Sequence, residues 1–251
     1  MKLARDMWLT FQYEVRQLLS SPAVIAFTLL TPVTYLLLFT PFLKSVLGAP
    51  SYDAAFQIYV PSLFCSMGLF GGLFSGLTLL ASMREGVVTR FRVTPMSRIG
   101  LVLGRELKPV VLCGIQAGVI AVLALALGLR LPPANFVLAM ILLAITNLLG
   151  VSISYSLAIT VPNETALANL INGMTQPLGL LAGVLVPLSV APLWIKDIAL
   201  WNPFAWATNA MRALFQGHLA DQVVWEAAVI LAGVCVLATA LSARLFTRET
   251  V

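Results

Sequence analysis

The sequence predicts an all-α integral membrane protein. Of its 251 residues, 60% are hydrophobic and only 10% are charged, whereas about 25% of the residues of an ordinary soluble domain are charged. The apolar residues form runs of about 18 or more, which is the length of helix that crosses a bilayer. A transmembrane β-barrel would show short segments of alternating apolar and polar residues, but segment 119–129 is apolar throughout. A bundle of long helices is therefore the expected fold.

We expect a single membrane domain over residues 1–251, and its first element is an amphipathic helix at 1–21. Charged side chains lie largely on other faces than the apolar ones, as in helices that rest on a membrane surface. A Ser-Ser-Pro sequence at 20–22 ends this helix. The apolar side chains at helical spacing are Leu3, Met7, Phe11, Val15 and Leu18.

Six membrane-spanning helices follow in the predicted order. The segment 187–221 interrupts the series with prolines, tryptophans and apolar stretches too short to cross a bilayer. We expect short re-entrant or interfacial helices there, before the sixth span. The predicted spans are 23–43, 56–82, 109–129, 136–161, 165–186 and 223–246.

The positions of the basic residues predict the orientation of the chain. If the N-terminus is cytoplasmic, eleven of the 15 Lys and Arg residues fall in inside segments and four in outside segments. This asymmetry is the one expected from the positive-inside rule, and six spans then place both termini in the cytoplasm. Short outside loops favour a bacterial inner membrane as the location.

The inside segment 84–98 is the main candidate for function. Val87 and Phe91 could anchor a short helix in the membrane interface, Gly86 permits a sharp turn, and Pro95 ends the helix. A basic loop that holds anionic lipid headgroups would explain the same composition. Physical chemistry alone leaves both interpretations open.

Two short patterns and the order of the predicted helices point to a known family. The first pattern is Arg84-Glu85-Gly86 with Arg90, Thr94, Pro95, Ser97 and Arg98, and the second is Asn202-Pro203 with Arg212 before the last span. These features resemble the ABC-2 type permeases of bacterial drug, polysaccharide and nodulation-factor exporters. The resemblance covers essentially the whole chain.

The resemblance implies that 84–98 is a cytoplasmic coupling helix that docks in a groove of a separate ATPase, with the turn at 162–164 as a second contact. The sequence contains no G-x-x-x-x-G-K-[ST] phosphate loop. ATP and Mg²⁺ would therefore be bound by the partner, and this chain would hold no cofactor and no catalytic site. The implied coupling residues are Arg84, Glu85, Gly86, Arg90, Phe91, Thr94, Pro95 and Ser97.

The resemblance also implies partners and cargo. Two ATPase copies, a second copy of this chain in a homodimer, and membrane lipid are the expected partners, and nucleic acid is not. The expected cargo is an amphipathic small molecule, a drug as in multidrug export, or a lipid-like compound. The alternatives are a polysaccharide or lipid-linked glycan and, from another class, a channel or structural subunit without an ATPase.

Two groups of residues inside the spans are candidates for packing or transport. Gly68, Gly72 and Gly76 form a small-residue stripe, which favours close helix packing with this chain or a second copy. Asn169, Asn172 and Gln176 share one face of the fifth span. They could line a translocation path or join helices by hydrogen bonds.

No residues with the spacing of a metal site are expected. The three cysteines lie inside apolar runs and are interpreted as small buried hydrophobic residues, and the single histidine, His218, as a surface residue. An intramembrane enzyme or an ion-coupled carrier would place ionisable side chains inside its spans. We expect none buried in the middle of a span, because Glu164, Asp197, Asp221 and Glu226 are scattered near the span ends.

Overall fold

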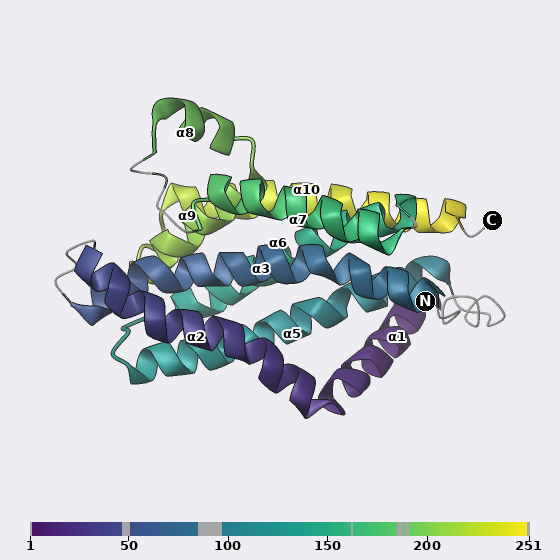
Figure 1. Cartoon of the computed structure of the whole chain (residues 1–251), viewed down its shortest axis with the longest axis horizontal. Helices are drawn as coiled ribbons and strands as arrows, with labels where there is room; N and C mark the ends of the chain where they lie inside the picture. The colour runs from purple at the N-terminus through teal and green to yellow at the C-terminus, as the bar shows by residue number, and fades with distance from the viewer. Residues whose placement is uncertain are drawn as a thin grey trace.

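A computed structural model of the chain describes residues 2–46, 51–84, 97–161, 163–184, 188 and 191–249 (Figure 1). Over this part of the chain every regular element is a helix, which confirms the all-α prediction. The helices are α1 (Lys2–Leu19), α2 (Pro22–Val46), α3 (Tyr52–Arg84), α5 (Arg98–Ala126), α6 (Pro133–Thr160), α7 (Glu164–Leu181), α8 (Leu193–Ala199), α9 (Pro203–Phe215) and α10 (Gln222–Glu249).

Five of the described helices are long and apolar enough to cross a membrane: α2, α3, α5, α6 and α10. The chain is therefore a multi-pass membrane protein. The predicted fifth span corresponds to α7, which is 18 residues long and carries several amides, and it is not among these five. The six-span layout stays a prediction in which α7 would supply the remaining crossing.

The bundle is built around the contact between α3 and α6, the most extensive helix pair in the described chain. Their central residues are small, so the two backbones come close together. A Cβ added to Gly72 would lie 2.6 Å from the carbonyl oxygen of Asn147 and 2.9 Å from the Cα of Gly150. The large buried side chains of Phe64, Phe204 and Phe215 fill the space where α9 packs against this pair.

Helix α5 starts earlier than the sequence analysis predicted. The predicted loop reached Lys108 and the third span began at Pro109, but the helix already begins at Arg98 and contains Pro109 in its interior. Proline is common at the start of a helix, which made Pro109 a natural boundary. Inside a membrane bundle, neighbouring groups can compensate for the backbone hydrogen bond that a proline removes. Three ionisable residues, Arg105, Glu106 and Lys108, thereby become part of the helix.

Helix α1 forms where an amphipathic helix was predicted, but its apolar side chains are divided between two environments. Leu18 is buried, while Leu3 and Trp8 are exposed. The side chains buried beside Leu18 are polar, Thr10 and Glu14, because this face lies on α5. The position of α1 relative to a membrane stays a prediction.

The segment predicted to hold short re-entrant helices contains α8 and α9. Helix α9 packs against α3, α6 and α10 and is largely buried, whereas α8 stands apart from the bundle (Figure 1). Neither is long enough to cross a bilayer, since α9 has 13 residues and α8 has seven.

The bundle has two distinct ends in Figure 1. The start of α1, the end of α3, the start of α5 and the end of α10 lie at one end, which we call the terminal end. Helices α8 and α9 lie at the opposite end, which we call the α9 end.

Candidate functional site

The predicted coupling residues fall mostly outside the described part of the chain. Those within segment 85–96, which the structure does not describe, are Glu85, Gly86, Arg90, Phe91, Thr94 and Pro95. Arg84 is the last residue of α3, and Ser97 immediately precedes α5. The environments of Arg84 and Ser97 therefore show how the segment is attached to the bundle.

Arg84 is paired with the start of α7. Its Nη1 atom lies 3.7 Å from Oε1 of Glu164, the first residue of that helix. Both side chains are about half exposed, so this ion pair adds little stability. The ion pair does, however, hold the start of α7 beside the end of α3.

Ser97 is held by α1. Its backbone N–H donates a 2.8 Å hydrogen bond to Oδ2 of Asp6. The first N–H groups of a helix have no partner within the helix, and a negative charge there also interacts favourably with the helix dipole. The Ser97 side chain itself makes no capping hydrogen bond, so the acceptor at the start of α5 comes from another helix.

Two glycines allow α1 to lie directly on α5. A Cβ on Gly104 would lie 2.6 Å from the Met7 carbonyl oxygen, and a Cβ on Gly100 would lie 3.1 Å from that of Leu3. The glycines are four residues apart and hence on one face of α5, where they let the two backbones approach. Asp6 reaches Ser97 because of this close contact.

A buried ion cluster strengthens the same contact. Glu14 on α1 accepts a 3.0 Å hydrogen bond from Nε of Arg105 and a 2.8 Å hydrogen bond from Nζ of Lys108, both on α5. Arg105 also donates from Nη1 to Oγ of Ser82 on α3, at 3.1 Å. Less than a tenth of the Glu14 and Arg105 side chains is exposed. The cluster thus links α1, α3 and α5 near the terminal end.

The neighbouring residue, Glu106, links α5 to two other helices. It is fully buried, and its two carboxylate oxygens accept hydrogen bonds from Ser242 on α10 at 2.8 Å and Ser152 on α6 at 3.2 Å. The Ser152 hydroxyl also lies 2.9 Å from that of Thr239 on α10. Glu106 is an ionisable residue inside a membrane-spanning helix, contrary to the expectation that the spans contain none.

Glu106 was not expected at a buried site because the predicted third span starts after this residue, at Pro109. A detectable signal existed, since the buried apolar side chains of α5 recur at a helical spacing that includes position 106. The buried residues on this face are Val102, Glu106, Cys113, Ala117, Ile120 and Ala124. A carboxylate in such a series predicts a polar partner on a neighbouring helix.

The second predicted motif forms a junction at the α9 end. Asn202 caps α9 by accepting from the Phe204 N–H at 3.1 Å, and its Nδ2 donates to the Leu178 carbonyl of α7 at 3.0 Å. Pro203 occupies the first position of α9, where the missing N–H costs nothing. Arg212 donates to Oγ of Ser62 on α3 at 2.8 Å and to the Gly183 carbonyl at 2.5 Å.

The three glycines of α3 face α6 of the same chain. Gly68 lies against Leu143 and Thr146, while Gly72 and Gly76 lie against the backbone of α6. Asn147 of α6 donates a hydrogen bond of 3.1 Å to the Gly68 carbonyl oxygen. This stripe therefore contacts a helix of its own chain.

The three amides of α7 lie on the surface of the single chain. Asn169, Asn172 and Gln176 are all exposed, and Asn172 donates only to the Ala168 carbonyl of its own helix, at 2.9 Å. The buried side of α7 carries Leu167 and Ile171 instead. The structure thus brings the three amides together on an outward face of α7. They are not part of the ion cluster of Glu14.

Comparisons with known proteins identify the family of the chain. The chain is 24% identical over 222 residues to the doxorubicin resistance ABC transporter permease protein DrrC of two Mycobacterium tuberculosis strains, covering 84% of this chain and 78% of that protein. It is 25% identical over 198 residues to the transport permease ycf38 of Porphyra purpurea, covering 77% of this chain and 68% of that protein. The sequence model described as ABC-2 type transporter matches residues 5–215, most of the chain. The protein is therefore a member of the ABC-2 type transporter family.

Proposed function

We propose that this chain is the membrane permease of an ABC exporter whose ATPase is a separate subunit. One observation carries the coupling part of the proposal: the two residues that flank segment 85–96 each contact a helix other than their own. Arg84 pairs with Glu164 of α7, and the Ser97 N–H is bonded to Asp6 of α1. A force applied to the segment by an ATPase would therefore reach α1 and α7 as well as α3 and α5.

Helix α5 is suited to carry such a force across the bundle. Arg105 and Glu106 are adjacent in sequence and project from α5 in different directions. Arg105 contacts Glu14 and Ser82, on α1 and α3, and Glu106 accepts hydrogen bonds from α6 and α10. A displacement of the start of α5 would thus act on four other helices through buried polar contacts.

The same geometry supports α7 as the sixth membrane crossing. Glu164 at the start of α7 lies beside Arg84. Just after the end of α7, the Gly183 carbonyl accepts a hydrogen bond from Arg212, which also donates to Ser62 on α3. Arg84 and Ser62 are about 22 residues apart along α3, which corresponds to about 33 Å of helix. A bilayer core is about 30 Å thick. With six crossings both termini face the cytoplasm, as the positions of the basic residues predict.

The exposed amides of α7 favour a dimer. A polar face left against lipid is costly because its hydrogen bonds to water are lost. Contact with a second copy of this chain, or with a water-filled path between the two copies, removes that cost. We therefore place the translocation path beside Asn169, Asn172 and Gln176, in a homodimer served by two ATPase subunits that bind ATP and Mg²⁺.

The proposed cargo is an amphipathic small molecule or drug, moved outward across a bacterial inner membrane. The relative named for doxorubicin resistance supports this choice. A polysaccharide or lipid-linked glycan is the alternative, and export assays with either class of compound would separate the two.

The proposal is tested by purifying the tagged chain in mild detergent from native membranes, with and without crosslinking. Mass spectrometry and an ATPase assay follow. We expect a P-loop ATPase in near-stoichiometric amount, and we expect charge reversal in the coupling segment, Glu85→Lys or Arg90→Glu, to weaken both its recovery and its activity. Arg16→Glu is a matched control, because Arg16 is an exposed arginine on α1 outside the segment.

Two outcomes would contradict the proposal. Recovery of the chain without any ATPase after crosslinking would favour a channel or a structural subunit. Full ATPase recovery and activity in both charge-reversal variants would mean that segment 85–96 does not couple the two subunits.

A further inference from the structure

A pocket at the α9 end is built from three helices. It has a volume of about 400 Å³, within the range of pockets that hold small molecules. Helix α8 contributes Lys196 and Ala199, α9 contributes Trp206 and Asn209, and the first turn of α10 closes one side. The complete lining is Leu188, Lys196, Ala199, Leu200, Ala205, Trp206, Asn209 and Val223.

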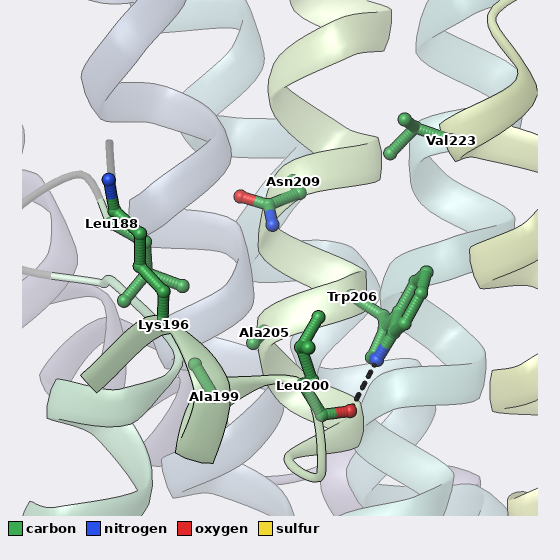
Figure 2. A pocket seen from close by; sticks show the side chains of 8 residues that line it. All are labelled: Leu188, Lys196, Ala199, Leu200, Ala205, Trp206, Asn209 and Val223. Carbon is green, nitrogen blue, oxygen red and sulfur yellow. Dashed lines mark hydrogen bonds between the residues drawn. The ribbon is translucent and has the colours of Figure 1, made fainter. Parts of the chain in front are cut away.

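The pocket combines an apolar wall of fixed shape with a polar side. The indole Nε1 of Trp206 donates a 2.9 Å hydrogen bond to the Leu200 carbonyl oxygen, which holds the ring in place (Figure 2). Figure 2 shows the Asn209 carboxamide directed from α9 toward the side of the pocket on which Lys196 lies. Among the described residues that line the pocket, Lys196 is the one with a formal charge, and that charge is positive. The neighbouring acid Asp197 is not part of the lining.

Helix α8 indicates where the pocket lies relative to a membrane. Its outward side chains are large and apolar: Leu193 is 77% exposed, and Trp201, just beyond its end, is 90% exposed. Trp194 and Ile198 are also exposed. A short exposed helix with one tryptophan inside it and another just after it is typical of the boundary between lipid headgroups and acyl chains. The pocket beneath α8 is then reached from the level of the headgroups.

We propose that this α8–α9 pocket binds the head of an anionic amphiphile that enters from the surrounding lipid. The ammonium of Lys196 and the amide of Asn209 would hold a phosphate or carboxylate, since charge-assisted hydrogen bonds of this kind are the strong ones. The apolar wall of Trp206, Ala205 and Leu200 would contact the adjoining carbon atoms. The attached chain would leave along the exposed face of α8. This inference does not depend on an ATPase partner.

The test uses the purified full-length chain and native mass spectrometry. Phosphatidylglycerol and phosphatidylcholine with identical acyl chains are titrated separately, and the bound lipid is counted. We expect phosphatidylglycerol to bind about tenfold more tightly, as one charge-assisted hydrogen bond allows. Lys196→Gln should abolish this preference, and Lys196→Arg should retain it. Arg130→Gln is the matched control, because Arg130 is a cation in the loop before α6, outside this pocket.

A second variant covers the case in which Lys196→Gln fails to fold. Asn209→Leu narrows the pocket at an exposed position of α9 and should also reduce binding of phosphatidylglycerol. Unchanged preference in both variants, or an equal loss in Arg130→Gln, would overturn the proposal. So would complete displacement of the lipid by millimolar inorganic phosphate, because the site would then recognise a free anion and not an amphiphile.

Discussion

Glu14 and Arg105, which are 91 residues apart in sequence, meet in a buried 3.0 Å hydrogen bond between α1 and α5. The contact joins the helix before the first span to the helix that follows the coupling segment. The sequence pattern predicts α1 at the membrane surface and Arg105 in the loop before the third span. The contact joins α1 to the bundle near the terminal end, and the position of α1 relative to a membrane stays a prediction.

Removal of the charge on Glu14 should strongly destabilise the protein. Glu14→Gln keeps the size of the side chain but leaves Arg105 and Lys108 without a counter-charge. Removing one partner of a buried ion pair costs about 3 kcal/mol or more. We expect a clearly lower melting temperature in detergent. Gln12→Ala, at an exposed position on the same helix, is the control and should change little. Equal melting temperatures of wild type and Glu14→Gln would mean that the cluster is not formed.

The contact between Asp6 and Ser97 should affect coupling more than stability. Asp6→Ala removes the acceptor for one N–H group at the start of α5, and the loss of such a cap costs about 1 kcal/mol. We expect a small change in melting temperature but a marked loss of transport-linked ATPase activity in the reconstituted complex. Asp6→Asn, which retains an acceptor oxygen, should recover much of that activity. Normal coupling in Asp6→Ala would contradict the role proposed for this contact.

Glu106 should tolerate an isosteric change better than a truncation. Glu106→Gln still offers hydrogen-bonding groups to Ser152 and Ser242, whereas Glu106→Ala leaves both hydroxyls facing a cavity. The truncation should cost about 2–3 kcal/mol from the lost hydrogen bonds and the cavity. Thermal unfolding of the two variants in the same detergent measures the difference. If Glu106→Ala melts at the temperature of Glu106→Gln, the carboxylate does not join α5 to α6 and α10.

Gly72 should not accept a side chain. Its added Cβ would lie 2.6 Å from the Asn147 carbonyl oxygen and 2.9 Å from the Gly150 Cα, and backbone atoms cannot rotate away. Gly72→Ala should therefore destabilise the α3–α6 contact by about 1–3 kcal/mol. The control is Gly118→Ala in α5, because no atom lies within 4 Å of its added Cβ. The control should be neutral or slightly stabilising, since alanine favours helix more than glycine does. A Gly72→Ala protein as stable as the control would rule out this close packing.

Local sequence patterns predicted where helices begin and end when the signal was contained in a few neighbouring residues. The break at Ser20-Ser21-Pro22 separates α1 from α2, and Asn163 caps the start of α7 by accepting from the Thr165 and Ala166 N–H groups. Pro109 misled the prediction because the same residue is favoured at a helix start and tolerated inside a packed membrane helix. The local sequence does not distinguish the two cases.

The candidate site was only partly predictable. The Asn202-Pro203 pattern and Arg212 were identified from the sequence, but not the partners that give them their geometry, Leu178, Ser62 and Gly183. Glu14, Arg105 and Lys108 were each visible as charged residues. Their cluster was not predictable, because it depends on α1 lying across α5 at two glycines.

By itself, the sequence determined the class of this protein: runs of apolar residues longer than a bilayer core require helices that cross it, and two short motifs with the helix order identify the family. Only the tertiary structure decided which polar groups meet. A buried charge is stable only when another helix supplies its partner. The pairing of Glu14 with Arg105, of Glu106 with Ser242 and of Arg212 with Ser62 therefore depends on how the helices pack, which no local stretch of sequence contains.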